Sequence, residues 1–250
     1  MRPRFFVDSV EREVALSAAD AHHARRVLRA RPGDLCELVV ESTGALLRGA
    51  FVQVGDAVVV RVDEVCPAPT VPRPGVALLQ ALPDPRKVDE IVEKGTEVGV
   101  DLFLIAPVSA SPPVPVDRLI ERATRWRRIA REAAKQSRRL TIPVVDVAAT
   151  LSAAGEYLKE GDWKSLVLDP AVGRPLKAVL GQVSRRGSPA RVALWVGPES
   201  GWSDEERAWF EQEGLPVATL GQEVLRTETA GPVAAAVCRF ALGDWEYTHA

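Results

Sequence analysis

The residues of this chain best suited to chemistry lie close together in its last quarter. Residues 226–229 place a cation, a carboxylate and two hydroxyl groups side by side. Two glycine-containing turns precede them, at Gly197 and Gly221, and each follows a stretch that predicts a strand. Because glycine has no Cβ, a ligand can approach the backbone closely at such turns. The pattern indicates that two loops could come together around one small ligand.

Each of these features also has a purely structural explanation. A Gly-Pro pair after a strand, as at Gly197, is commonly just a turn. Thr227 or Thr229 could cap the last helix, which is predicted to begin at Glu228, and Glu228 would then lie in its favourable first turn. A cap accounts for the hydroxyl groups and the carboxylate, but it leaves Arg226 unexplained.

Strands that alternate with helices are predicted on both sides of these turns. The apolar run 192–196 before Gly197 is typical of a buried strand, and Ser203 after it predicts the cap of a helix with an acidic first turn. Such alternation favours a largely parallel sheet covered by helices. The predicted strands are 76–82, 101–106, 166–168, 192–196 and 216–220, and the predicted helices are 84–98, a basic helix over 118–139, 151–159, 176–183 and one from residue 228.

The beginning of the chain has a different pattern. Strands are predicted near 4–7 and over 35–41, 45–54 and 57–65, with one helix that Ser17 caps and that runs to about residue 30. The following segment, 66–74, holds four prolines in nine residues and is therefore stiff and extended. We therefore expect two domains, over residues 1–70 and 71–250.

The composition is ordinary for a soluble globular protein, with 46% hydrophobic and 26% charged residues among 250. No stretch approaches the roughly twenty apolar residues that a membrane span needs, and the N-terminus lacks the apolar core of a secretory signal. Three widely spaced cysteines and three scattered histidines suggest neither a disulfide framework nor a metal cluster. We therefore expect a cytoplasmic protein without a metal and without a membrane partner.

Charge is distributed unevenly along the chain, although the net charge is only −2. Residues 118–139 hold nine basic and two acidic residues, whereas from residue 196 onward three arginines face ten acids. A basic helix in an otherwise acidic molecule could bind a phosphate backbone, or it could be a solvated helix face. We favour phosphate binding, because two acids on the same helix cannot pair with nine cations.

Four motifs in a fixed order give the chain a resemblance to a known family. They are KGTEVGV at 94–100, AAKQSRR at 133–139 after an Arg-Trp pair, GPESG at 197–201, and LG at 220–221 followed by LRTETA at 225–230. With them, the whole chain resembles the bacterial methyltransferases that modify N3 of a uridine in 16S rRNA. These enzymes belong to the knotted SPOUT superfamily, which uses S-adenosylmethionine (SAM). HHARRVLR at 22–29 is similar to the early helix of the family's RNA-binding barrel.

The resemblance implies an α/β fold that patterns alone do not reveal. The C-terminal methyltransferase domain would have a mostly parallel sheet with helices on both faces, and its chain would be tucked through a loop in a trefoil knot, an exception to the usual avoidance of knots. The N-terminal domain would be a small PUA-like RNA-binding β-barrel. The family further implies a homodimer, with 16S rRNA of the small ribosomal subunit as its partner.

The resemblance also implies a site, in which SAM lies bent within the knot. Because uridine N3 must lose a proton before it attacks the methyl group, a cation or backbone N–H groups should stabilise the developing anion. Arg226 is our candidate for this role, with Glu228 as a base or as a partner that orients Arg226. The residues expected around SAM are Gly197, Pro198, Glu199, Gly201, Leu220, Gly221, Leu225, Arg226, Thr227 and Thr229. Those expected to contact RNA phosphates are Arg25, Arg26, Arg29, Arg125, Arg128, Lys135, Arg138 and Arg139.

The chain departs from the family pattern in two loops. Ser200 stands where the family usually has glycine, and the segment 108–112 lacks the Glu-Arg pair that the family commonly carries. Pro232, early in the last helix, could kink it. These departures leave two alternatives open, a non-catalytic RNA-binding assembly factor that retains the knot and a knotted methyltransferase that acts on tRNA. A Rossmann dinucleotide enzyme is disfavoured, because no GxGxxG follows the first strand.

Overall fold

The protein is described by a computed structural model that covers residues 2–68, 73–183 and 191–244. It divides into two compact units, and each is described by itself. The first comprises Met1–Val71 together with Ala134–Ile142, and the second comprises Pro72–Ala133 with Pro143–Ala250. The first unit thus includes a segment from the middle of the chain, and the domain boundary at residue 70 stays a prediction.

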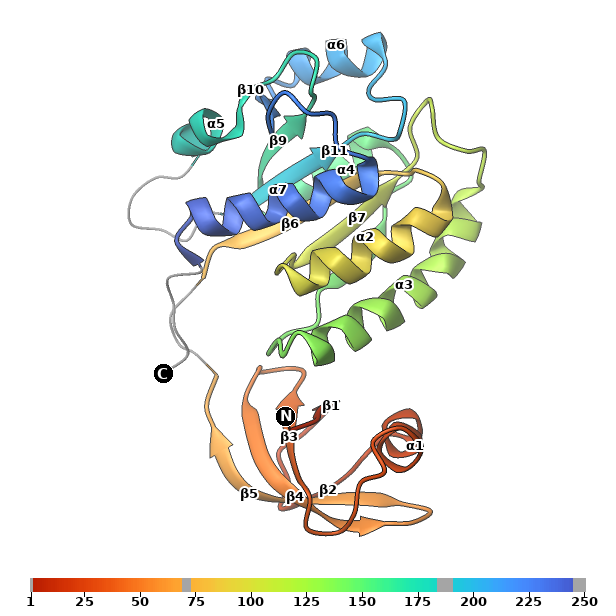
Figure 1. Ribbon diagram of the computed structural model, residues 1–250. Helices are drawn as coiled ribbons and strands as arrows, with labels where there is room; N and C mark the ends of the chain where they lie inside the picture. Colours follow the sequence, from red (N-terminus) through yellow and green to blue (C-terminus); the bar gives the residue numbers. More distant parts are fainter. Residues whose placement is uncertain (1, 69–72, 184–190, 245–250) are drawn as a thin grey trace. The chain divides into compact units, whose positions relative to one another are not determined.

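The first unit is built on a five-stranded sheet with the order β1-β3-β4-β5-β2 (Figure 1). β1 and β3 are parallel and the other neighbours antiparallel, and two register shifts between β4 and β5 bend the sheet. Ser17 caps the single helix as predicted, since its side chain accepts a hydrogen bond from the Asp20 amide. The elements are β1 (Arg4–Val7), β2 (Glu13–Ala15), α1 (Ala18–Arg26), β3 (Leu35–Val40), β4 (Leu46–Val54) and β5 (Val58–Cys66).

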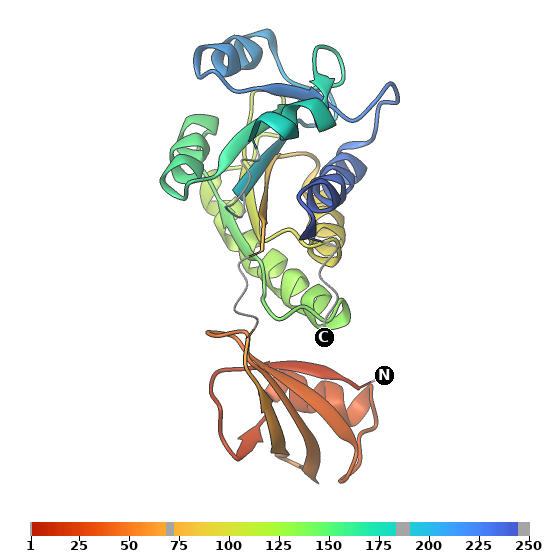
Figure 2. The same ribbon diagram turned by 90° about the vertical axis from the view of Figure 1, so that its left-hand side faces the viewer.

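The second unit has a seven-stranded sheet with the order β10-β12-β9-β11-β6-β7-β8, and every neighbouring pair in it is parallel (Figure 2). The strands are β6 (Gly75–Ala81), β7 (Leu102–Ala106), β8 (Val144–Val147), β9 (Lys164–Leu168), β10 (Arg174–Pro175), β11 (Arg191–Val196) and β12 (Val217–Thr219). The helices are α2 (Pro85–Glu97), α3 (Val116–Gln136), α4 (Leu151–Glu160), α5 (Leu176–Val183), α6 (Asp204–Gln212) and α7 (Thr227–Ala241). The predicted α/β architecture is confirmed; β8 and β10 were not predicted.

Helices cover both faces of this parallel sheet, which explains why its central strands are nearly continuous apolar runs. Side chains alternate between the two faces. Val76 and Leu78 of β6 pack with α2, α3, α5 and α7, whereas Ala77 and Leu79 pack with α4 and α6. Pro232 lies inside α7, which nevertheless continues to Ala241. No helix in the described parts of the chain is long and apolar enough to cross a membrane.

A buried arginine fastens the far end of α7. The side chain of Arg239 is completely buried, and its Nη1 donates to the Pro74 carbonyl at 2.8 Å and to Asp244 at 2.7 Å. Its Nη2 donates to the Gly99 carbonyl and to Asp101. A buried charge is tolerated only when it is paired and hydrogen-bonded, so these partners fix the position of the helix against the start of β6 and the α2–β7 connection.

Candidate functional site

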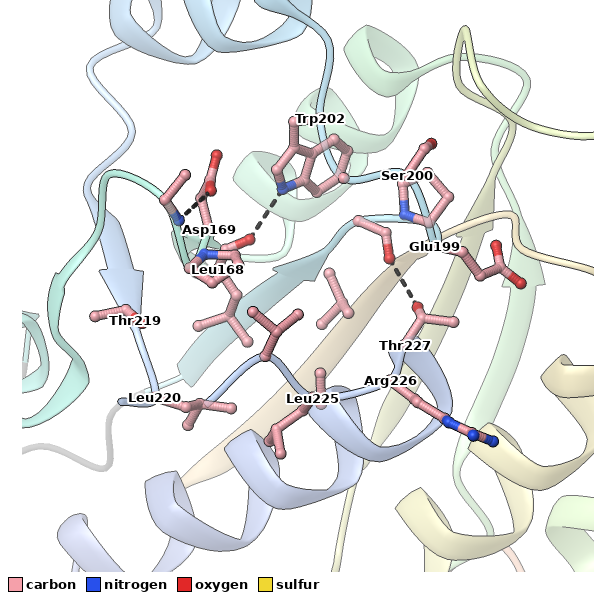
Figure 3. Close-up of a pocket in the computed structure, with 18 of the residues that line it drawn as sticks. Leu168, Asp169, Glu199, Ser200, Trp202, Thr219, Leu220, Leu225, Arg226 and Thr227 are labelled. Atoms are coloured by element: carbon pink, nitrogen blue, oxygen red, sulfur yellow. Dashed lines mark hydrogen bonds between the residues drawn. The ribbon is translucent and has the colours of Figure 1, made fainter. Parts of the chain in front are cut away.

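A cavity of about 540 Å³ opens where three neighbouring strands of the parallel sheet end (Figure 3). The chain leaves β9 at Asp169, β11 at Gly197 and β12 at Leu220, and all three residues line the cavity. The start of α7 supplies a further wall, with Leu225 and Thr227. The carboxyl ends of parallel strands are the usual place for a ligand site in such sheets. The geometry therefore marks this cavity as the candidate functional site.

Most of the residues predicted to surround a ligand line this cavity. Gly221 and Thr229 do not. Leu168, Asp169, Trp202, Arg207 and Lys87 line it too, although the sequence did not single them out. The predicted residues that line it are Gly197, Pro198, Glu199, Gly201, Leu220, Leu225, Arg226 and Thr227.

The GPESG segment forms a tight turn whose last glycine has a left-handed backbone conformation. The amide of Gly201 donates to the Pro198 carbonyl at 3.0 Å, and the φ angle of Gly201 is +76°, in the left-handed region. Ser200 has no such positive φ. A serine is therefore accommodated here without backbone strain, and its hydroxyl-bearing side chain lies on the cavity wall.

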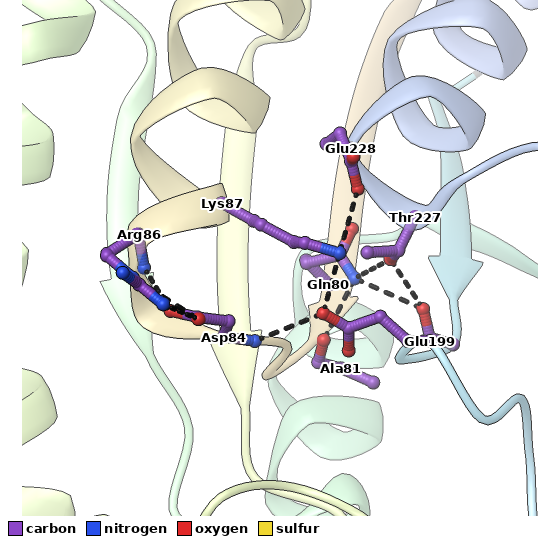
Figure 4. Close-up of polar contacts among 9 residues, drawn as sticks. Gln80, Ala81, Asp84, Arg86, Lys87, Glu199, Thr227 and Glu228 are labelled. Carbon is purple, nitrogen blue, oxygen red and sulfur yellow. Dashed lines mark hydrogen bonds and ion pairs between the residues drawn. The ribbon is translucent and has the colours of Figure 1, made fainter.

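The hydroxyl of Thr227 joins the start of α7 to the GPESG turn. Its Oγ1 donates to the Gly197 carbonyl at 2.7 Å and accepts a 2.9 Å hydrogen bond from Nε2 of the buried Gln80 (Figure 4). Arg226 occupies the N-cap position of α7, and no side chain caps that helix. The expectation that Thr227 or Thr229 caps α7 is therefore wrong, because the Thr227 hydroxyl is used across the sheet instead.

Lys87, in the first turn of α2, forms a three-residue cluster at the edge of the cavity. Its Nζ lies 2.9 Å from Oε1 of Glu199 and 3.4 Å from Oε2 of Glu228 (Figure 4). The hydrogen bond to Glu199 raises the pKa of Lys87. Partial burial alone would raise the pKa of Glu199, but hydrogen bonds from Lys87 and from backbone amides, together with the charge of Lys87, lower it. The pair of Lys87 and Glu199 is therefore stabilised in its charged form.

The two predicted catalytic residues lie differently with respect to the cavity. Arg226 is exposed and lines it, at the same end as Glu199, whereas Thr219 and Leu220 lie at the other end (Figure 3). No ion pair of Arg226 is found within the described segments of the chain. Glu228 pairs with Lys87 and not with Arg226, and it does not line the cavity.

Hydrogen bonds hold the wall of the cavity that Leu168, Asp169 and Trp202 form. The Asp169 carboxylate, whose side chain is only 3% exposed, accepts 2.8 Å hydrogen bonds from Nε of Arg207 and from the Ala171 amide. The indole N–H of Trp202 donates to the Leu168 carbonyl at 3.0 Å. Both contacts join the end of β9 to the segment after β11. The only hint in the sequence is that an aspartate follows directly on a predicted strand.

The loop after β7, where the family's Glu-Arg pair is missing, is anchored by Glu206. One carboxylate oxygen of Glu206 accepts hydrogen bonds from the amide and the hydroxyl of Ser109, at 3.0 and 2.9 Å. The other accepts from the Ser203 amide at 2.8 Å, which completes a capping box at the start of α6. The altered loop is therefore fixed to the helix that follows the GPESG turn.

Acids from other elements pair with several of the predicted RNA-binding cations. In the first unit Lys135 pairs with Asp20 at 2.5 Å and Arg138 with Glu37 at 2.7 Å, and in the second unit Arg125 pairs with Asp89 at 2.6 Å. The premise that the basic helix lacks acidic partners is therefore wrong. Arg139 is buried, and Arg25 donates to the Gly55 carbonyl at 2.8 Å. Arg26, Arg29 and Arg128 are exposed.

Among the residues with described positions, no group of three or more His, Cys, Asp or Glu side chains is arranged to hold a metal ion. Of the charged side chains that line the cavity, Lys87 pairs with Glu199 and Arg207 with Asp169. The site therefore suits an organic ligand held by backbone groups, apolar side chains and a few charges.

Comparison with known proteins assigns the chain to a family. A model of the RNA methyltransferase domain matches residues 71–239. The ribosomal RNA small subunit methyltransferase E of Mycobacterium tuberculosis is 31% identical over 255 residues, which cover 97% of this chain and 93% of that protein. The chain belongs to the ribosomal RNA small subunit methyltransferase E family. The resemblance seen in the four motifs is thus confirmed.

Other members and structures agree with this assignment. The methyltransferase E of Synechocystis is 30% identical over 228 residues, covering 91% of this chain and 73% of that protein. The crystal structure of the methyltransferase E from Neisseria gonorrhoeae, bound to S-adenosylmethionine, has a TM-score of 0.80 at 22% identity and covers 96% of this chain and 98% of that one. A SAM complex of a methyltransferase from Legionella pneumophila has a TM-score of 0.83 at 24% identity, with 96% and 98% covered. These likenesses establish the fold of the methyltransferase E family.

Proposed function

We propose that the protein is a SAM-dependent methyltransferase that modifies N3 of a uridine in 16S rRNA of the small ribosomal subunit. The observation that carries the proposal is the cavity at the ends of β9, β11 and β12, closed by the LRTETA segment, in a chain of this family. The relative from Neisseria gonorrhoeae binds SAM, and the present cavity has the chemistry for the same ligand.

The lining of the cavity fits SAM in two respects. Leu168, Leu220 and Leu225 provide an apolar surface for an adenine ring, and the turns at Gly197 and Leu220 present backbone groups to it. Glu199 supplies a carboxylate suited to a sulfonium cation. When bound, SAM would supply an electrophilic methyl group. Gly221 and Thr229 are also proposed to contact SAM. These two contacts have less support, since neither residue lines the cavity.

Residues of this chain then position the acceptor base and stabilise the negative charge that develops on it. The N3–H of uridine is deprotonated in the reaction, and Arg226, exposed at one end of the cavity, stabilises the anion that develops over O2, N3 and O4. Thr227 fixes the loop that carries Arg226. Glu228 stays part of the catalytic proposal, now as the partner of Lys87.

We infer that the C-terminal chain is knotted and that the first unit is a PUA-like RNA-binding barrel. The knot is supported by the sheet order, because β12 lies between β9 and β10, which precede it in sequence, and the chain then returns to pack α7 on β6 and β11. The barrel is supported by the bent five-stranded sheet, and RNA binding by Arg26 and Arg29, which are exposed at the end of α1 and just after it. A homodimer is supported by Val237 and Phe240, apolar residues of α7 that are 38% and 70% exposed. A protein that methylates ribosomal RNA would act in the cytoplasm.

The test combines binding and activity. Calorimetry should show that the protein binds SAM, and the protein should methylate small ribosomal subunits but not bulk tRNA. Mass spectrometry of 16S rRNA from cells that lack the gene should then show the loss of one N3-methyluridine. Absence of SAM binding would favour a non-catalytic assembly factor, and methylation of tRNA would favour the other knotted enzyme.

A further inference from the structure

Lys87 lines the cavity but has no part in the reaction as proposed so far. It comes from α2, whereas its two partners come from the loop after β11 and from the first turn of α7. The Lys87 and Glu228 side chains are 32% and 12% exposed. Three elements of the second unit thus converge on one ammonium group (Figure 4).

The geometry leaves this ammonium group with capacity for a ligand. A lysine ammonium has three N–H donors. Glu199 and Glu228 face two of them, at 2.9 and 3.4 Å, so a third can serve an oxygen atom in the cavity. Because carboxylates on two sides hold Nζ, its position is set before a ligand arrives. Preorganised cations of this kind give the largest stabilisation to charge that develops during a reaction.

We propose that Lys87 is a catalytic residue whose ammonium group stabilises the anion of the acceptor nucleobase. The proposal rests on the proposed function. In the step it serves, the N3–H bond of uridine breaks and the proton passes to solvent water. The N3 electron pair then forms the bond to the methyl carbon as the bond from that carbon to sulfur breaks, and the positive charge of the sulfonium is neutralised. Lys87 donates a hydrogen bond to a carbonyl oxygen of the anionic uracil throughout.

The carboxylates of Glu199 and Glu228 allow Lys87 to stay protonated while it stabilises the anionic base. A uracil N3 ionises only under alkaline conditions, so its cationic partner must still be protonated there. Glu199 and Glu228 raise the pKa of Lys87 above the ordinary lysine value and keep it charged. Asp84, at the start of α2, is a further carboxylate near Glu199, and it is bound to Arg86. Arg226 adds a second cation at the same end of the cavity, so two cations balance Glu199 and Glu228.

The test compares Lys87→Met and Lys87→Arg with the wild type in single-turnover methylation of small subunits, over a range of pH. We expect Lys87→Met to lower the rate by about 100-fold, the usual effect of removing one group that stabilises a developing anion. The pH–rate profile of Lys87→Met should move to higher pH, because the uracil N3 then loses its proton without the stabilising ammonium group. Lys87→Arg should restore a tenth or more of the rate. The SAM dissociation constant of both variants should stay within about twofold of the wild type.

The matched control is Lys94→Met, which removes a lysine from the same helix that pairs with Glu97 at 3.1 Å and does not line the cavity. It should keep the wild-type rate. An unshifted pH profile in Lys87→Met, with no rescue by arginine, would reduce Lys87 to a structural residue and overturn the proposal. So would a tenfold weaker binding of SAM at an unchanged rate, since Lys87 would then bind the carboxylate of SAM. A wild-type protein that methylates no small subunit would overturn the proposed function along with this proposal.

Discussion

The hydroxyl of Thr227 donates a 2.7 Å hydrogen bond to the carbonyl of Gly197, across 30 residues of sequence. Gly197 begins the turn after β11, and Thr227 begins α7. The same hydroxyl accepts from Gln80 of β6, so one small side chain joins two segments of the cavity wall to a central strand of the sheet. The turn at Gly197 and the start of α7, which both line the cavity, are therefore held together.

Thr227→Val removes this hydroxyl and nearly preserves the shape of the side chain. We expect the free energy of unfolding to fall by about 1–3 kcal/mol, because the buried groups of Gly197 and Gln80 lose a partner. SAM should bind more weakly as well. Urea unfolding and calorimetry measure the two effects. Thr229→Val is the control: Thr229 is exposed and does not line the cavity, so the change should stay within about 0.5 kcal/mol. Equal effects in both variants would contradict the role of Thr227.

Glu206→Ala should destabilise the second unit by about 2 kcal/mol, since it removes charge-assisted hydrogen bonds to Ser109 and Ser203 together with the capping box. Glu205→Ala removes a first-turn acid from the same helix that is exposed. Both variants lose the favourable interaction with the helix dipole, so the difference between them isolates the contacts of Glu206. Thermal or urea unfolding measures it. A difference near zero would show that the loop after β7 needs no such anchor.

Two buried thiols predict how stability changes at alkaline pH. Burial raises the pKa of both Cys36 and Cys238 from the ordinary value of 9.0 to about 12. The negative charge of Glu37 adds to this effect at Cys36. Between these values the unfolded chain has lost the thiol proton and the folded chain keeps it, so the free energy of unfolding falls as pH rises. The slope is about 1.4 kcal/mol per pH unit for each thiol. Cys238→Ala should therefore show a shallower decline than the wild type between pH 9 and 10.5. An unchanged slope would show that Cys238 ionises in the folded protein.

RNA binding should depend steeply on salt if phosphate contacts dominate it. Arg128→Ala should lower the slope of log Kd against log salt by about one, because Arg128 is exposed and no ion pair of it is found in the described segments. Arg125→Ala, on the same helix, should have the smaller effect, since Asp89 already pairs with Arg125 at 2.6 Å. Filter binding of a 16S rRNA fragment at several salt concentrations measures both. A flat salt response in the wild type would contradict phosphate binding by this helix.

Features with a local signal could be predicted from the sequence. Ser17, Asp84 and Ser203 begin their helices as predicted, because a side-chain cap depends on residues only two or three positions apart. The apolar runs marked the central strands correctly. The short strands β8 and β10 escaped prediction, since four and two residues carry too little periodicity.

Features that depend on distant partners could not be predicted. A threonine at the start of a helix gives the same local signal whether it caps the helix or bonds across the sheet. The alternative in which Thr227 caps α7 was wrong for this reason, although Thr227 lines the cavity as predicted. Lys87 looked like any solvated helix residue, because Glu199 and Glu228 reach it only through the fold. The pairs of Arg125 and Lys135 were missed for the same reason. In each case the topology decides which charges meet.

The buried Arg239 has a consequence for how the protein is made. Pro74, Gly99 and Asp101, which bind its guanidinium, are synthesised long before it. While the ribosome is still translating, these groups face water, and the sheet lacks both β12 and the helix that closes the cavity. The second unit can therefore complete its folding only when nearly the whole of it has emerged from the exit tunnel. The cavity for the cofactor is complete only then.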